Sequence, residues 1–494
     1  MKKYYIEYVK DKYRFKMGDL NYLSAYGLAI NTYDDQTLDF NNMLRGIEVN
    51  YNISDDIMIK GMVGSGQFNF RSKASLDSSD FYYDKQTSHF EIQNNTFIGN
   101  DFFNISNITY SFLYDKTINY YDQIFPNYII SLPHLLVRKE LNGRLSDIAS
   151  ANVDIVDLND KTHSFSMQFT LNETDFYMER TWINYQKILS DDNEVGSRFY
   201  FSIYRNILEF DITYDHALYN APFQISNIVN PPICMYENNS ALTSRTTTTI
   251  DFNNAIANQI EVRKFFGDIE WLFNASLFYK KVPHDDDGHL VEGNANYLEI
   301  FNFNIDNLNS YNNIKYYHPI KKLYSEISRW FFDSRLFFKI GIAAYNNLSS
   351  EVAVEKSYTI PIHYSYKINN GSTLTGYLEY QSRSKEQNLF QEYPDYYSKL
   401  YDTYYSSFSY SFNYNYVISV FQEIENYSYD DGEIENGKKT WKGIQFSMRF
   451  LNNNSIEAFY GSQRGGLVCA NGVCGVYPGF KDGFKVTLRL NYDM

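Results

Sequence analysis

Alternation of apolar and polar residues at every second position is the feature that most constrains this chain. From Phe408 to Val420, Phe, Tyr, Ile and Val recur at every second position, and the residues between them are mainly Ser and Asn. From Phe484 to Tyr492, apolar residues alternate with Lys485, Thr487, Arg489 and Asn491. A period of two places successive side chains on opposite faces of a β-strand. The sequence therefore predicts strands with one apolar and one polar face.

The same pattern recurs along the whole chain, at 13–17, 47–53, 360–368 and 444–450. Some of these segments are joined by tight turn signals such as Asn452-Asn453-Asn454-Ser455, and others by long polar stretches. Short turns that alternate with long loops are typical of a transmembrane β-barrel. A helical membrane protein is excluded, because the mean hydropathy is −0.45 and no apolar run approaches the length of a membrane helix.

The apolar positions are rich in aromatic residues, which make up 18% of the chain and include 48 Tyr. A soluble sandwich or propeller is the alternative, but its core would be mainly Val, Leu and Ile. Tyr and Phe instead suit the two aromatic girdles of a membrane barrel. We therefore expect an all-β, antiparallel transmembrane barrel of about 16 to 20 strands. It forms one domain over residues 1–494, with long polar outer loops at about 221–256, 281–330 and 383–404.

The charge of the chain limits its possible binding partners, and its cysteine content indicates its cellular compartment. The net charge is −15 and no run of five basic residues exists, so nucleic acid is not an expected partner. Cys469 and Cys474 lie close together with no nearby His, which favours a disulfide over a zinc site, while Cys234 stands alone. A disulfide implies an oxidising compartment.

Met1-Lys2-Lys3 is not followed by the apolar core of a signal peptide, so we expect a removed signal or an internal, N-terminally truncated start.

Some motifs resemble known families. The stretch Gln463-Arg464-Gly465-Gly466 up to Cys474, followed by a final amphipathic strand, is similar to the ending of TonB-dependent receptors, although no plug domain precedes the barrel. The chain more closely resembles an uncharacterised family of Gram-negative outer-membrane barrels, a domain of unknown function. The motifs that carry this resemblance are Lys16-Met17-Gly18-Asp19, Leu44-Arg45-Gly46, Tyr219-Asn220-Ala221-Pro222, Ser244-Arg245 and Glu379-Tyr380-Gln381. The resemblance implies an outer-membrane location and no assigned chemistry, so it carries over no catalytic residues.

The polar strand faces supply the candidate site residues. No nucleophile elbow, zinc-protease motif or phosphate loop is present, so we expect no enzyme, no catalytic residues, no metal and no cofactor. If the barrel is open, basic lumen residues would favour anions. Salt-bridged rows that fill the lumen are the alternative. The pore-lining candidates are Arg14, Lys16, Glu48, Lys60, His363, Lys367, Glu379, Arg449, Lys485 and Arg489.

Two functions follow from this reading. The first is a passive pore or transport conduit for small polar or anionic solutes in the outer membrane, with the lipid bilayer as its main partner. The second is a non-conducting barrel, plugged by side chains or loops, that displays surface loops to an envelope complex or secretion system. Sugar stacking by loop rings such as Tyr393, Tyr396 and Tyr397 is an alternative to interface anchoring.

Overall fold

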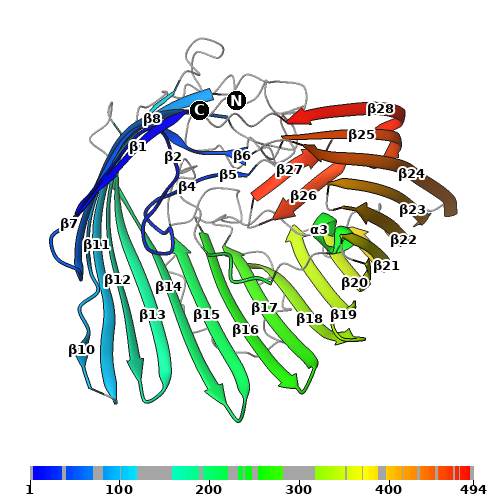
Figure 1. The fold of residues 1–494 in the computed structure, drawn as a ribbon, viewed down its shortest axis with the longest axis horizontal. Coiled ribbons are helices and arrows are strands. Elements are labelled where there is room, and N and C mark those ends of the chain that lie inside the picture. Colours follow the sequence, from blue (N-terminus) through cyan, green and yellow to red (C-terminus); the bar gives the residue numbers. More distant parts are fainter. Residues whose placement is uncertain are drawn as a thin grey trace.

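The alternating segments form strands of one antiparallel sheet that curls into a ring (Figure 1). Each long strand of this wall pairs with the long strands before and after it in the chain, and a two-residue strand at Ile98–Gly99 pairs only with the strand that follows it, so the sheet is a meander without crossovers. This confirms the expected all-β, antiparallel barrel. The computed structural model describes residues 4–35, 40–69, 82–100, 102–119, 158–187, 193–220, 232–236, 240–246, 254–281, 317–350, 353–369, 371–387, 397–413, 415–430, 434–450, 454–470, 473–477 and 479–489.

The strands of the wall follow the chain in order. They are β1 (Tyr5–Lys10), β2 (Tyr13–Leu20), β7 (Leu44–Asn52), β8 (Ile57–Asn69), β9 (Tyr82–Asn94), β10 (Ile98–Gly99), β11 (Phe103–Asn119), β12 (Leu158–Leu171), β13 (Thr174–Lys187), β14 (Asn193–Ile207), β15 (Phe210–Asn220), β16 (Asn254–Phe266), β17 (Ile269–Lys281), β18 (Tyr317–Phe331), β19 (Leu336–Ser350), β20 (Ala353–Asn369), β21 (Ser372–Gln387), β22 (Tyr397–Phe412), β23 (Tyr416–Asp430), β24 (Ile434–Phe450), β25 (Asn454–Gln463) and β28 (Phe480–Arg489).

The remaining elements are short and lie off the wall. They are β3 (Tyr22–Leu23), β4 (Asn31–Thr32), β5 (Asp34–Asp35), β6 (Phe40–Asn41), α3 (Ala241–Thr246), β26 (Gly466–Ala470) and β27 (Val473–Tyr477). The edge strands of the sheet are β1 and β28, which flank the remaining opening of the ring (Figure 1). Within the described part of the chain, no ladder joins these two strands.

The sheet has 22 strands, more than the expected number. The expected number of strands is too low because several strands are joined by very short turns, so each strand with its connection uses fewer residues. Between β12 and β13, for example, only Asn172 and Glu173 form the turn, with φ of 47° and 61°. Two consecutive residues with positive φ are the geometry of a tight hairpin turn that matches the twist of its strands.

Two predicted boundaries are wrong. The alternating run from Phe408 to Val420 is two strands, because the chain reverses between the end of β22 and the start of β23. Asn413 at this turn has a φ of 49°. The alternation continues through the turn because Phe412 and Tyr416 are direct register partners and so share a face. The outer loops are also narrower than expected, since β16, β18, β21 and β22 extend into the ranges given for them.

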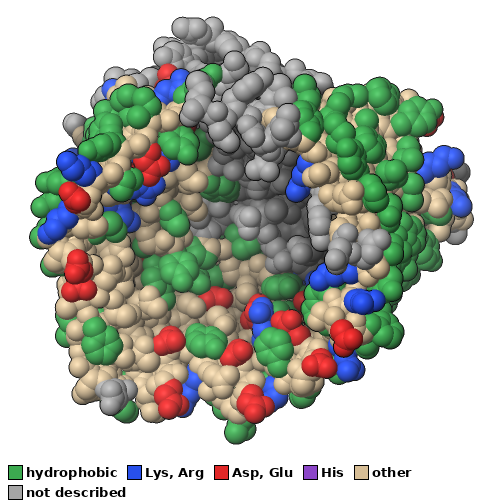
Figure 2. Space-filling model, in the orientation of Figure 1, with side chains coloured by type: hydrophobic (Ala, Val, Ile, Leu, Met, Phe, Trp, Pro, Cys, Tyr) green, Lys and Arg blue, Asp and Glu red, His purple; other side chains and the backbone are tan. Residues whose placement is uncertain are grey.

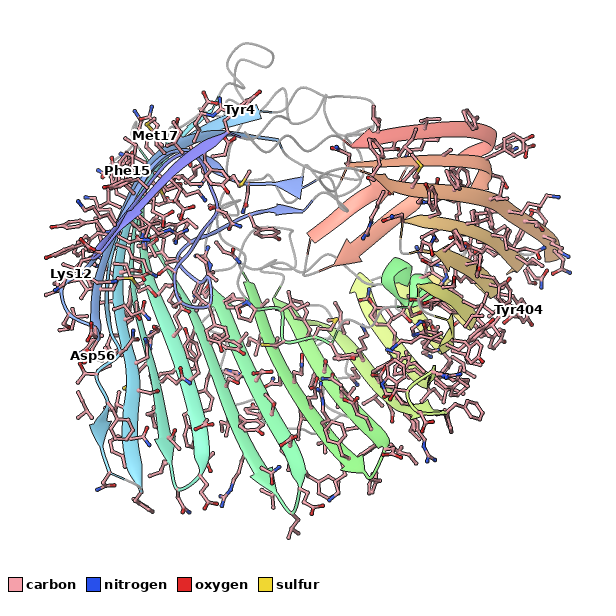
Figure 3. The ribbon with its side chains drawn as sticks, in the orientation of Figure 1. Tyr4, Lys12, Phe15, Met17, Asp56 and Tyr404 are labelled. Atoms are coloured by element: carbon pink, nitrogen blue, oxygen red, sulfur yellow. The ribbon has the colours of Figure 1, made fainter. Side chains whose placement is uncertain are left out.

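The two faces of the wall are the reverse of those in a soluble protein. On β9, Phe90 and Ile92 are 41% and 39% exposed, whereas His89 and Glu91 are 4% and 1% exposed. Figure 2 shows hydrophobic side chains gathered over β24, β25 and β28 on the right, and Figure 3 places Tyr404 on the outer side of the ring. An apolar exterior around a polar interior requires lipid outside, so the strands form a transmembrane barrel rather than a sandwich.

The two rims of the barrel differ. Tight connections, such as those after β12, β14 and β16, share one rim, and the connections that follow β2, β15 and β25 leave the opposite rim, called here the long-loop rim. Among the described residues, no helix is both long and apolar enough to span a bilayer. The short elements β3, β4 and α3 belong to connections of the long-loop rim, and they fold back into the lumen.

Candidate functional site

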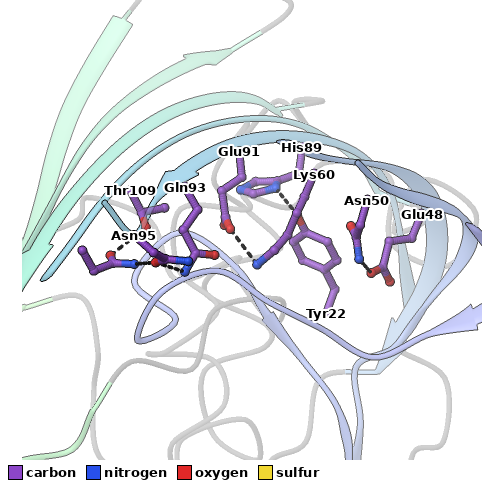
Figure 4. Close-up of polar contacts among 10 residues, drawn as sticks. Tyr22, Glu48, Asn50, Lys60, His89, Glu91, Gln93, Asn95 and Thr109 are labelled. Carbon is purple, nitrogen blue, oxygen red and sulfur yellow. Dashed lines mark hydrogen bonds and ion pairs between the residues drawn. The ribbon is translucent and has the colours of Figure 1, made fainter. Parts of the chain in front are cut away.

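Polar side chains on neighbouring strands form continuous rows across the inner wall. One row runs from Arg14 on β2 through Asn50 and Lys60 to Glu91 on β9, each residue being the register partner of the next. Lys60 Nζ lies 2.8 Å from Glu91 Oε1 (Figure 4). In the adjacent row, Glu48 is buried and accepts a hydrogen bond of 2.9 Å from Asn50 Nδ2. The lumen wall is therefore a network of paired charges and amides.

The first segment inside the lumen is residues 21–35, which follow β2. The Tyr22 hydroxyl is hydrogen-bonded to His89 Nδ1 at 2.9 Å (Figure 4). Tyr26 N donates to Glu179 Oε2 on β13 at 2.9 Å. Wall residue Arg198 donates from Nη1 to the carbonyl oxygen of Leu28 at 3.2 Å. Inward side chains of the wall thus hold the backbone of this first inward segment.

The second inward segment contains residues 232–236 and 240–246. The Tyr219 hydroxyl donates to the carbonyl oxygen of Pro232 at 2.6 Å, and Lys322 Nζ donates to that of Tyr236 at 2.5 Å. The Glu379 carboxylate on β21 accepts three hydrogen bonds of 2.9 Å each at the start of α3. Their donors are Ser240 Oγ, Ala241 N and Leu242 N.

The third inward segment begins after β25. Arg464 lies 2.7 Å from Glu423 and 2.6 Å from Glu425, two neighbouring inward carboxylates of β23. Its guanidinium also lies over the ring of Trp441, 5.1 Å from the centroid. Burial alone would lower the pKa of Arg464, but the charges and hydrogen bonds of Glu425 and Glu423 raise it above its usual value. The following strand β26 contacts α3, so the second and third segments meet inside the barrel.

An apolar core lies within the lumen where the first two segments meet the wall. Leu28 of the first segment and Cys234 and Met235 of the second are buried in one cluster with wall side chains of β14 to β19. The wall contributes small residues there, Ala217, Ala255 and Ala257, which leave room for the inserted chain. Burial, and next the charge of Asp215, raise the pKa of the Cys234 thiol well above its usual range.

The predicted pore-lining residues lie in three separate groups rather than one ring. In the first, Arg14 Nε is 2.7 Å from Glu7 Oε1, Lys16 Nζ lies 4.6 Å from the centroid of the Tyr5 ring, and Glu48 and Lys60 occupy the rows described above. The second group is on β20 and β21 and contains His363, Lys367 and Glu379. The third is on β24 and β28 and contains Arg449, Lys485 and Arg489.

The second group adjoins the second inward segment, and Glu48 and Lys60 of the first group lie beside Tyr22 of the first inward segment (Figure 4). His363 stacks on Tyr377 with ring centroids 4.4 Å apart, and both line a small pocket with Ser240, Lys339 and Glu379. Lys367 instead lies over the Trp330 ring at 5.2 Å and is exposed. In the third group, Arg449 and Lys485 are exposed, and the backbone of Arg489 pairs with Ser455.

Cys469 and Cys474 are direct register partners across the β26–β27 hairpin. Their side chains lie outside the described residues, so the disulfide stays a prediction. Cys234 is free and buried. Tyr393 and Tyr396 also lie outside the described residues, as do most of the predicted outer loops.

Sequence reasoning missed most residues that hold the inward segments: Glu179, Arg198, Lys322, Glu423, Glu425 and Arg464. Several of them stand next to another charged residue in the sequence, so the alternation of apolar and polar residues is not visible at these positions. Glu179 is followed by Arg180, which points outward, and Lys322 is preceded by Lys321. A search for charged residues in phase with Ser and Thr on the polar face could have found Glu179, because it lies two residues before the buried Thr181.

No family model and no curated protein matches the chain, so the resemblance to an uncharacterised barrel family stays a prediction. Among solved structures, the chain is similar to the copper transporter OprC, with 8% identity, a TM-score of 0.39, and coverage of 91% of this chain and 69% of that one. It is similar to the FrpB iron transporter from Neisseria meningitidis, with 10% identity, a TM-score of 0.39, and coverage of 92% and 75%.

A third similar structure is a ferric enterobactin receptor from Pseudomonas aeruginosa, with 7% identity, a TM-score of 0.33, and coverage of 91% and 77%. Within the described residues, no group of three or more His, Cys, Asp or Glu is placed to hold a metal ion.

Proposed function

We propose that this chain is an outer-membrane β-barrel that acts as a conduit for small polar solutes and is closed at rest by its own inward segments. The observation that carries the proposal is the polar wall held against three chain segments by inward charges such as Glu179, Arg198, Glu379 and Glu423. A barrel this wide would leave an aqueous channel without such filling. A filling held by hydrogen bonds can be displaced without unfolding the wall.

The apolar exterior and the unequal rims support the outer-membrane location. Bacterial outer-membrane barrels have an apolar band facing lipid, short periplasmic turns and longer outer loops. All three inward segments leave the long-loop rim, so this proposal has the barrel closed from the cell exterior.

Planar-bilayer conductance tests the closure. A variant in which residues 22–32 are replaced by a Gly-Ser chain of equal length removes the contacts of Tyr22, Tyr26 and Leu28. We expect few openings from the unaltered protein and frequent, larger current steps from the variant. The matched control replaces residues 53–56, the turn between β7 and β8 on the opposite rim, in the same way, and it should behave like the unaltered protein.

The two contrary outcomes have different meanings. Equal, steady conductance with and without residues 22–32 would show that the inward segments do not close the barrel. Silence from both, with a folded wall, would favour the second function, a non-conducting barrel that displays loops to an envelope complex. Anion preference stays part of the proposal, and it is tested by the reversal potential of the double variant Arg449→Glu, Arg489→Glu, which should shift toward cations.

A further inference from the structure

Within the described residues, the wall has two edge strands, β1 and β28, and their directions limit how the ring can close. The 22-stranded sheet includes the two-residue strand β10, which pairs only with β11, so it contains 21 long strands. Each long strand is antiparallel to the next, from β1 and β2 to β25 and β28. Because the direction reverses at every step, the first and last of an odd number of strands run the same way. Both β1 and β28 run from the long-loop rim to the opposite rim.

Direct closure of the ring would therefore join two parallel strands. Bacterial single-chain outer-membrane barrels have an even number of antiparallel strands, and parallel pairing is slightly less stable per residue than antiparallel pairing. One more strand between β1 and β28, running from the opposite rim to the long-loop rim, would be antiparallel to both. The directions of the edge strands thus define a place for a single strand in the opening of the ring (Figure 1).

β1 presents backbone groups to this opening at every second residue. Asp19 N donates a hydrogen bond of 2.8 Å to the carbonyl oxygen of Tyr4, so the backbone groups of Tyr4 face β2. Since alternate residues of an antiparallel strand direct their N–H and C=O groups to opposite sides, those of Tyr5, Glu7 and Val9 face the opening. The Val9 side chain is 66% exposed. Such an edge is a template for pairing with another strand.

The outward side chains of β1 are apolar and exposed. Ile6 and Tyr8 are the register partners of Met17 and Phe15, which lie on the outer side of the ring (Figure 3). Ile6 and Tyr8 are each more than half exposed. The edge strand therefore carries apolar surface toward lipid, like the rest of the wall.

The outward side chains of β28 have the same character. Phe484, Val486 and Leu488 are each more than half exposed, whereas Phe446 on β24, a strand with neighbours on both sides, is 38% exposed. A strand placed in the opening would cover part of the apolar surface of both edges if its own apolar residues faced lipid. The opening therefore suits a strand with one apolar and one polar face.

The required direction limits the source of this strand. A connection that leaves and re-enters the wall at the long-loop rim adds strands in pairs, so it leaves the edge strands parallel. A second copy of the chain has the same orientation in the membrane, so its edge strands also run from the long-loop rim to the opposite rim. Residues 1–3 and 490–494, which adjoin the edges, are shorter than the about 9–11 residues of a membrane-spanning strand. A strand of the required direction therefore has its source outside residues 1–494.

We propose that the opening between β1 and β28 binds one amphipathic β-strand of a second polypeptide, antiparallel to both edges. This strand has its N-terminal end at the opposite rim, its apolar residues toward lipid and its polar residues toward the lumen. Strand addition to a sheet edge takes its affinity from backbone hydrogen bonds and its specificity from alternate side chains. The inference rests on the barrel wall and goes beyond the conduit function, so loss of conductance would not bear on it.

Peptide binding to the full chain, folded in detergent, tests the inference. The probe is a fluorescent synthetic peptide with the sequence of residues 454–463, which form β25. This strand runs from the opposite rim to the long-loop rim and is antiparallel to β28, so the peptide has the direction that the opening requires. We expect saturable binding of one peptide per chain, measured by fluorescence anisotropy. A peptide of the same ten residues, reordered so that its apolar residues no longer alternate, should bind at least tenfold more weakly.

Two substitutions at one position show whether the peptide occupies the opening. Val9→Pro removes an N–H group that faces the opening, and proline is tolerated on an edge strand where its nitrogen faces away from the ladder. We expect at least tenfold weaker peptide binding to this variant. Val9→Ala keeps the N–H group and is the matched control, which should bind like the unaltered chain. A peptide that only exchanged with β25 would bind both variants equally, and that result, or no saturable binding at all, would overturn the inference.

Disulfide trapping tests direct closure of the ring. Outward cysteines are introduced in pairs, Ile6→Cys or Tyr8→Cys with Val486→Cys or Leu488→Cys. An intervening strand keeps the two edges about two strand spacings apart, roughly 9.5 Å, whereas a disulfide requires Cα atoms within about 7 Å of each other. We expect no disulfide between β1 and β28 in any pair when the peptide is bound. A disulfide that forms equally with and without the peptide would show that the edges close directly as parallel strands, and the proposed strand site would then not exist.

Discussion

At the scale of single residues, Glu379 is the wall residue whose loss should be easiest to detect. Its carboxylate accepts three hydrogen bonds of 2.9 Å from the start of α3. Glu379→Ala removes these acceptors, so we expect the second inward segment to leave the lumen at least ten times more often, a change of about 1.4 kcal/mol. The readout is alkylation of the buried Cys234 thiol, which should be at least tenfold faster in the variant. Glu457→Ala on β25 is the control, and an equal rate in both variants would contradict the prediction.

Arg464 allows a second test at this scale, because it faces two carboxylates that are almost fully buried. Arg464→Gln removes the guanidinium from Glu423 and Glu425, and we expect a loss of about 3 kcal/mol in the free energy of unfolding, measured in urea. Changing both carboxylates to Gln in the same chain should restore most of this loss, because no buried charge then remains. A triple variant as unstable as the single one would show that packing on Trp441, rather than charge, explains the effect.

At the scale of elements, the β26–β27 hairpin joins the filling of the lumen to the end of the wall. Because Cys469 and Cys474 are register partners, a disulfide between them would fix the hairpin that contacts α3. We expect one free thiol per chain under non-reducing denaturing conditions and three after reduction. Three thiols without reduction would contradict the disulfide. Cys469→Ser should expose one additional thiol and, if the hairpin steadies α3, hasten alkylation of Cys234 in the folded protein.

At the scale of the whole molecule, the reversed faces of the wall predict which substitutions the barrel tolerates. Ile418 and Val417 are neighbours on β23, but Ile418 faces outward and is 48% exposed, whereas Val417 faces the lumen. Ile418→Lys places a charge against lipid two residues inside the start of β23, between the interface and the bilayer midplane, and should destabilise the barrel by about 1 to 2 kcal/mol. Val417→Lys should cost less than about 1 kcal/mol because the lumen is polar. Folding yield in lipid vesicles measures both, and equal yields would argue against a membrane barrel.

Much of the wall could be predicted from the sequence because a period of two is a local signal. The outward positions Ile47, Val49 and Ile418 are exposed as the alternation predicts. The filling of the lumen could not be predicted, since its contacts join residues far apart in the chain. Glu379 was predicted to line a pore, and nothing near it in the sequence shows that it holds Ser240. The positive φ of Asn413, which divides one alternating run into two strands, is likewise set by a turn and not by periodicity.

The sequence separation of these contacts has a consequence for the order of folding. Tyr26 and Glu179 are 153 residues apart, Leu28 and Arg198 are 170 apart, and Ser240 and Glu379 are 139 apart. Each of these hydrogen bonds joins an inward segment to a wall strand that lies more than 130 residues later in the sequence. Contacts between residues so far apart in the sequence form late in folding. We therefore expect the lumen to fill only after the surrounding strands have paired. Protection of residues 22–32 from hydrogen exchange during refolding should then appear later than protection of β13 and β14. A barrel whose lumen is filled has therefore already paired its wall strands.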